Sequence, residues 1–155
     1  MIKLDFKAAK EGFFDRKVVV DAVDRASLKV LSKFGAYVRT RAKSSIRKRK
    51  KSSQAGQPPS SHVGTLKNLI FFSFDQRKKS VVIGPTLITR STMAPETLEH
   101  GGETDLPGHE FKTVDGKKVY KRTSKRVKIA KRPYMEPAFE AEKPGLPAMW
   151  ENSIR

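Results

Sequence analysis

The chain has 155 residues, which is typical of a single domain, and its 33 Lys and Arg against 16 Asp and Glu give a formal net charge of +17. This surplus predicts a polyanion or an acidic protein surface as a neighbour. The absence of Cys excludes a disulfide scaffold, a thiol nucleophile and an iron-sulfur site, and it favours a reducing cytoplasm as the origin. No apolar run approaches the roughly 18 residues of a membrane span, and charged residues interrupt the N-terminus, so we expect neither a membrane segment nor a secretory signal.

The strongest local pattern predicts a long helix from about Asp15 to Ile46. Apolar residues recur there every three or four positions and form one stripe along the helix. At about 1.5 Å per residue the helix would be roughly 48 Å long, which is longer than a small domain needs to cover its own sheet. We therefore expect part of it to contact a neighbouring subunit. The stripe consists of Val19, Val23, Ala26, Val30, Phe34, Val38, Ala42 and Ile46.

A run of five basic residues is expected to end this helix, because like charges crowd together there. The Ser, Gly and Pro residues that follow predict a flexible basic loop over about 47–63, lying outside any core. The run has no interleaved aromatic residues, so stacking on single-stranded nucleic acid is not expected. Contact with DNA phosphates, contact with an acidic protein surface and a plain solvated loop remain the alternatives. The run comprises Arg47, Lys48, Arg49, Lys50 and Lys51.

Several short strands are predicted around this helix. Residues 2–6 alternate apolar and charged side chains, which is typical of a half-buried strand. Residues 65–68 predict one helical turn before a strand over 69–74, whose antiparallel hairpin partner is expected over 80–84. Because residues 69–74 are apolar on both faces, we expect that strand to be central, or to lie between the long helix and another subunit.

Acidic and basic residues are segregated in the second half of the chain. Residues 94–110 contain Glu and Asp but no Lys or Arg, whereas basic residues dominate 112–132. We expect an acidic turn followed by a basic hairpin over about 111–132, with Asp115 and Gly116 in a type I′ turn. The two charged segments are expected to pair between subunits. A last helix is predicted from Glu136, with Pro137 near its start and a break at Pro144 to Pro147.

Two groups of metal-ligand side chains occur, and neither predicts a site. Both lie among Gly and Pro residues, where no helix or strand is expected to hold ligands in place. The second resembles a metal-dependent nuclease in its letters only, and the chain has no phosphate loop and no nucleophile elbow. We therefore expect a protein without catalytic activity, cofactor or metal. The groups are His100, Glu103 and His109, and Asp105, Glu110 and Lys112.

Five short passages follow one another in a distinctive order. They are the long amphipathic helix, a Pro-rich segment leading through Gly and Leu into a strand, a second strand over 80–85, a helix ending in Leu-Glu-His-Gly, and an Arg-Pro-Tyr-x-x-Pro-Ala entry to the last helix. This order resembles the tail-component family of long-tailed bacteriophages, which includes tail-completion and head-tail joining proteins. The matching positions are Pro58, Gly64, Leu66, Glu99, Gly101, Arg132, Pro133 and Pro137.

The resemblance implies an α+β protomer over residues 1–155, with a small antiparallel sheet packed on the long N-terminal helix and a C-terminal helix. It implies a ring of six subunits in the neck or tail end of the virion, assembled in the host bacterial cytoplasm. Its partners would be further copies of itself, a head-side connector or stopper protein, and a tail tube or tail terminator protein, with DNA passing through the lumen. The matching positions would then serve the family fold or the subunit interface. The alternative is a sequence-nonspecific, basic nucleic-acid-binding protein.

Overall fold

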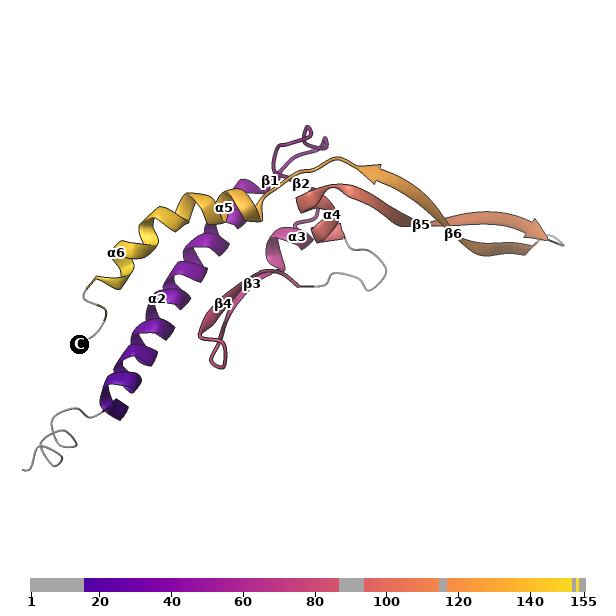
Figure 1. Cartoon of the computed structure of the whole chain (residues 1–155). Helices are drawn as coiled ribbons and strands as arrows, with labels where there is room; N and C mark the ends of the chain where they lie inside the picture. Colours follow the sequence, from indigo (N-terminus) through magenta and orange to yellow (C-terminus); the bar gives the residue numbers. More distant parts are fainter. Residues whose placement is uncertain (1–15, 87–93, 115–116, 152, 154–155) are drawn as a thin grey trace, which may run out of the picture.

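The computed structural model describes residues 16–86, 94–114, 117–151 and 153, and it has an α+β architecture built along one long helix (Figure 1). The strand expected over residues 2–6 lies outside the described residues. No helix in these ranges is long and apolar enough to cross a membrane. The helices are α2 Arg16–Ser45, α3 Thr65–Asn68, α4 Ala94–His100, α5 Met135–Glu142, the 3-10 helix η1 Lys143–Gly145 and α6 Leu146–Trp150. The strands are β1 Arg47–Lys48, β2 Ser60–Ser61, β3 Ile70–Asp75, β4 Ser80–Pro85, β5 Gly102–Val114 and β6 Lys117–Ile129.

Helix α2 confirms the predicted long helix and most of its apolar stripe. The helix ends at Ser45, immediately before the basic run, as expected. The stripe is buried from Ala26 onward, but Val19 and Val23 are 41% and 39% exposed. The core therefore lies against the C-terminal part of α2. It is formed by Phe34, Val38, Ala42, Ile46, Ile70, Tyr134 and Ala138.

The described strands form three separate two-stranded sheets rather than one small sheet. Strands β1 and β2 are parallel, and the predicted β3–β4 hairpin is antiparallel and packs against α2. The packing is close at Gly35, where an added Cβ would lie 2.8 Å from Val81 Cγ2. Strand β3 is not central, because β4 is its only neighbour among the described strands. Ile70 is buried and Phe71 is 47% exposed, so only one face of the strand is covered.

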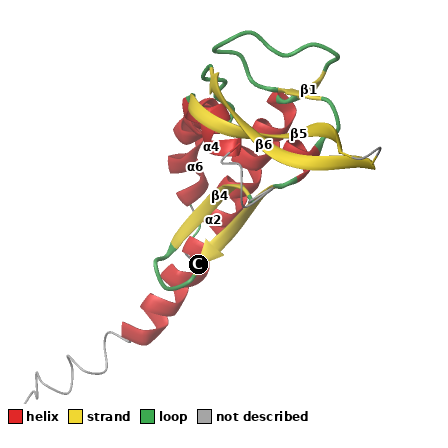
Figure 2. Ribbon diagram, turned by 90° about the vertical axis from the view of Figure 1, so that its right-hand side faces the viewer, coloured by secondary structure: helices red, strands yellow, loops and turns green. Residues whose placement is uncertain are grey.

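Strands β5 and β6 form a hairpin far longer than the sequence predicts. Each has 13 residues, and the hairpin projects as an arm from the rest of the molecule (Figures 1 and 2). The expected acidic turn is wrong, since residues 102–110 lie in β5. Asp105 is opposite Arg126, whose Nε lies 3.4 Å from the carboxylate, and Glu103 is opposite Lys128. Opposite charges on facing strands stabilise a two-stranded hairpin. The acidic and basic segments therefore pair in part within one chain.

The C-terminal helical segment is interrupted at Pro144, as predicted, but by the 3-10 turn η1 between α5 and α6 and not by a loop. Pro144 and Pro147 stand in the first turns of η1 and α6, where a missing backbone N–H is tolerated. The segment lies along α2 (Figure 1). Phe139 meets Phe34 edge to face with ring centroids 5.7 Å apart, and Arg41 pairs with Glu142.

Candidate functional site

Three segments that are far apart in the sequence meet beside the core, and they carry most of the positions on which the expected family resemblance rests. We call this region, residues 52–66, 97–101 and 131–136, the motif junction. The backbone N–H of Gly56 donates to the carbonyl of Lys131 at 2.8 Å. Arg132 donates twice, from its backbone N–H to Leu98 O at 2.7 Å and from its Nε to Ser53 O at 3.1 Å. The junction therefore joins the loop after β1 to the segment between β6 and α5.

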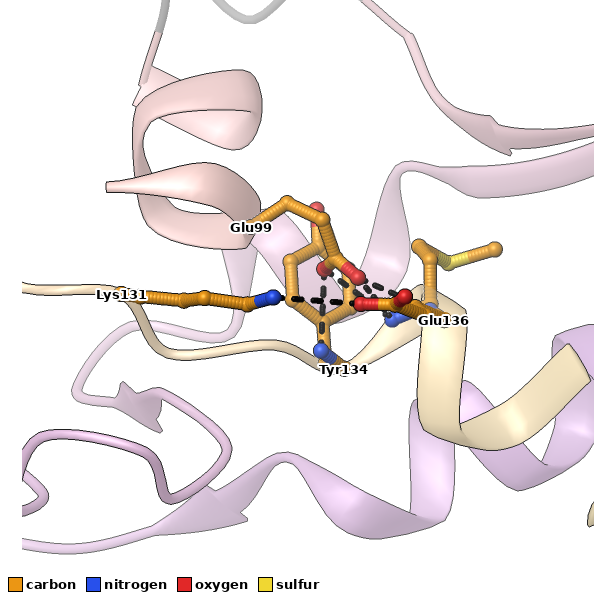
Figure 3. A network of polar contacts seen from close by, with 5 residues as sticks. Glu99, Lys131, Tyr134 and Glu136 are labelled. Carbon is orange, nitrogen blue, oxygen red and sulfur yellow. Dashed lines mark hydrogen bonds and ion pairs between the residues drawn. The ribbon is translucent and has the colours of Figure 1, made fainter. Parts of the chain in front are cut away.

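Glu99 is the central side chain of the motif junction (Figure 3). Glu99 is only 7% exposed. Its carboxylate accepts hydrogen bonds from the backbone N–H groups of Tyr134 at 2.9 Å, Met135 at 3.1 Å and Glu136 at 2.8 Å. These donors belong to the start of α5, where Tyr134 provides no side-chain cap. A carboxylate is favoured there because helix N-termini carry free N–H groups and a partial positive charge. Glu99 thus caps α5 from α4.

Gly101 confirms the helix stop predicted after Glu99. Its φ of +77° is in the left-handed region, and its N–H donates to Thr97 O at 2.8 Å. An added Cβ would lie 3.1 Å from the backbone nitrogen of Lys131. The position therefore requires glycine for both its conformation and its close approach to the strand leading into α5.

The other matching positions are less tightly engaged. Gly64 and Leu66 line a pocket together with Arg132. Pro58 and Pro133 are half-buried, and Pro137 is exposed as the third residue of α5. The structure thus brings Glu99, Gly101 and Arg132 together. No contact among the described residues assigns a role to the three prolines.

Two residues of the junction were missed by sequence reasoning. Tyr134 is fully buried, and burial together with the nearby Glu99 raises the pKa of its hydroxyl. Its position between Pro133 and the start of a helix is the sequence signal that could have identified it. Ser53 is buried although its Ser- and Gly-rich surroundings predict exposure, and no local pattern could have identified it.

The five basic residues are exposed, as predicted. The loop that follows them is held against the motif junction, which the sequence did not predict. All five residues from Arg47 to Lys51 are exposed, and none has a described carboxylate within ion-pair distance. Strand β1 begins the run and pairs with β2. The segment that follows is not wholly exposed, since Ser53, Pro59 and Ser61 are buried, although none of them belongs to the core cluster. The bonds from Gly56 and Arg132 hold the loop against the junction.

The described residues provide no support for metal chemistry. Within them, no three His, Asp or Glu side chains gather closely enough to hold an ion. Asp105 is engaged by Arg126 on the hairpin, and the side chains of His109, Glu110 and Lys112 lie outside the described ones.

Comparisons with known proteins give no further guide to function. No protein-family model, no curated protein and no solved structure matches this chain. The geometry of the junction, the exposed helix end and the hairpin arm therefore carry the functional argument.

Proposed function

We propose that this chain is a structural virion protein of a tailed bacteriophage, a ring protomer at the head-tail interface that acts in tail completion or head-tail joining. Six copies surround a lumen through which DNA passes. The neighbours along the axis are a head-side connector or stopper protein and a tail tube or tail terminator protein. The protein acts by assembly and not by catalysis.

The observation that carries this proposal is the hairpin arm. Strands β5 and β6 pair over 13 residues, and among the other described elements only α4 makes more than a marginal contact with them. A two-stranded hairpin is marginally stable on its own in water, because it buries little apolar surface. An arm of this length is therefore expected to rest on a neighbouring molecule.

The N-terminal part of α2 gives a second, independent support. Val19, Val20, Val23 and Leu28 are exposed there. An arm on one side and an apolar helix end on another are different surfaces, as a head-to-tail contact between identical subunits requires. Repetition of such a contact around an axis closes a ring.

The proposal is tested by native mass spectrometry and electron microscopy of the full chain. The native protein is expected to form rings, and the double variant Val19→Ser/Val23→Ser is expected to remain monomeric. The control Val63→Ser removes an equally apolar and more exposed side chain from the loop, so it should form rings like the native protein. A native protein that stays monomeric both alone and within assembled particles would contradict the proposal.

The exposed basic run favours the alternative function, nonspecific binding of nucleic acid, enough to require its own test. Neutralisation of Arg47 to Lys51 with Gln should leave rings intact. Lost DNA affinity with a shallower salt dependence would identify phosphates as the partner, and lost head-tail joining at unchanged DNA affinity would identify a protein. The control neutralises five exposed basic residues elsewhere and changes the net charge equally. These are Lys33, Arg77, Lys78, Lys131 and Lys143, which lie outside the hairpin arm and the N-terminal part of α2.

A further inference from the structure

An open pocket lies at the motif junction, and the proposed function assigns it no role. Its volume is about 380 Å³, inside the range of roughly 300–1,000 Å³ that is usual for ligand sites. Its walls come from the loop after β1, strand β2, the turn into α3, the end of α4 and Arg132. The polar lining consists of hydroxyl side chains, one imidazole and one guanidinium, and it includes no carboxylate. Such a lining offers hydrogen-bond donors and a positive charge.

The Arg132 guanidinium has a charge that no described group neutralises. Its Nε donates to Ser53 O at 3.1 Å and its Nη1 to Ala130 O at 3.3 Å, and both acceptors are uncharged carbonyls. No described carboxylate lies within ion-pair distance of it. Since a guanidinium has five N–H donors and these bonds use two, about three remain. The group is half-buried and held in place, which suits it to grip an oxyanion.

Two hydroxyls in the pocket wall have no partner. The Oγ atoms of Ser53 and Ser60 are both buried and make no hydrogen bond, and Ser53 is only 6% exposed as a residue. Buried polar groups are almost always paired, because desolvation without a hydrogen bond costs free energy. Ser53 and Ser60 both line the pocket. A change of the χ1 rotamer would bring either buried oxygen to the pocket surface, where its hydroxyl could donate to a ligand.

The surroundings of the pocket are strongly positive. Strand β1 lies beside β2, with Lys48 opposite Ser61, and Lys51 immediately precedes the lining residue Ser52. These exposed cations raise the local concentration of anions at the entrance. We infer that the pocket binds a phosphate group, which the Arg132 guanidinium and the Ser53 and Ser60 hydroxyls hold by hydrogen bonds. The phosphate is either free inorganic phosphate or a phosphodiester of DNA.

Inorganic phosphate is the first probe, titrated into the full chain at constant ionic strength and followed by ³¹P NMR. The native protein should bind it saturably. The variant Ser53→Ala/Ser60→Ala should bind about tenfold more weakly, because two donors are lost. Its thermal stability should be unchanged or higher, since the hydroxyls have no partner to lose. The control Ser73→Ala/Ser124→Ala removes two exposed hydroxyls from β3 and β6 and should bind like the native protein.

Two outcomes would overturn the inference. One is a native protein that shows no saturable phosphate binding, and the other is a Ser53→Ala/Ser60→Ala variant that binds as tightly as the control. If the double variant fails to fold, Ser60→Ala alone decides in the same way. Arg132→Lys adds a second readout, because it keeps the charge and loses the planar fork, and it should weaken binding as well.

A DNA competition distinguishes the two sources of the phosphate. If inorganic phosphate displaces a short DNA duplex from the native protein but not from Ser53→Ala/Ser60→Ala, at constant ionic strength, the pocket holds a backbone phosphate. If phosphate binds without affecting DNA affinity, the ligand is free phosphate. The inference does not depend on ring formation, because phosphate binding is measurable in a monomer and ring formation is measured by mass.

Discussion

The two ends of α2 have the same apolar periodicity and opposite surroundings. The C-terminal part buries Phe34, Val38 and Ala42 against the β3–β4 hairpin and the C-terminal helices. The N-terminal part leaves Val19 and Val23 exposed. Periodicity identifies the face of a helix that will be covered, but it does not say whether the cover comes from the same chain. Substitutions at the two ends should therefore change different measurable quantities.

The largest effect on stability is expected from Phe34→Ala. Truncation of a buried aromatic side chain removes its packing and leaves a cavity, which costs about 3–5 kcal/mol of the free energy of unfolding. Val20→Ala at the exposed end should cost less than about 0.5 kcal/mol. Urea denaturation at low protein concentration measures both. Similar losses for the two variants would mean that the N-terminal end is covered within the monomer.

Glu99→Gln should give the next largest loss. The variant replaces a charged acceptor of three backbone N–H groups by an amide whose nitrogen cannot accept, so the free energy of unfolding should fall by about 2–3 kcal/mol. Glu96→Gln on the same helix is exposed and should change it by less than about 1 kcal/mol. Equal effects in denaturation would refute the role of Glu99 as the cap of α5.

Gly101→Ala is expected to cost about 1–2 kcal/mol, because a side chain disfavours positive φ and its Cβ would press on the backbone at Lys131. Gly145 is the matched control. Its φ of −78° is in the right-handed helical region, and an added Cβ would lie 4.0 Å from Met149 Cε. Gly145→Ala should be neutral or should stabilise the protein by about 0.4–1 kcal/mol. A harmless Gly101→Ala in thermal unfolding would place the helix end elsewhere.

The buried Tyr134 in the core makes the free energy of unfolding depend on pH. Its pKa is raised in the folded protein from a usual value of 10.0, so above about pH 10 the unfolded chain binds fewer protons than the folded one. The stabilisation is complete below pH 10 and is lost as the pH rises. The free energy of unfolding should therefore fall more steeply above pH 10 in the native protein than in Tyr134→Phe. Parallel alkaline profiles would exclude this contribution.

The smallest change in monomer stability is expected from Val19→Ser/Val23→Ser, within about 0.5 kcal/mol for each substitution, because both residues lie on the surface at about 40% exposure. Analytical ultracentrifugation should nevertheless show a large fall in self-association. If the variant loses several kcal/mol of monomer stability and its self-association is unchanged, the N-terminal end of α2 packs within the monomer and does not contact a neighbouring subunit.

The sequence by itself determined the elements whose signals are local. The 3.6-residue period of α2, its end at the basic run, the turn before β3 and the β3–β4 hairpin all follow from neighbouring side chains and backbone geometry. The left-handed stop at Gly101 is local as well, since glycine tolerates that conformation without strain. The register of the long hairpin places Val114 opposite Lys117, and the type I′ turn expected at Asp115 and Gly116 lies outside the described residues.

Only the tertiary structure decided which distant segments satisfy one another. Strand β5 contains Gly, Pro and acidic residues that oppose a strand locally, and its pairing with β6 overrides them. The donors that meet Glu99 lie at least 35 residues away in the chain, and Arg132 binds the carbonyl of a serine 79 residues earlier. A side chain's own neighbours in sequence do not show which free N–H group or unpaired hydroxyl it will face. That is settled when the segments pack together and exclude water.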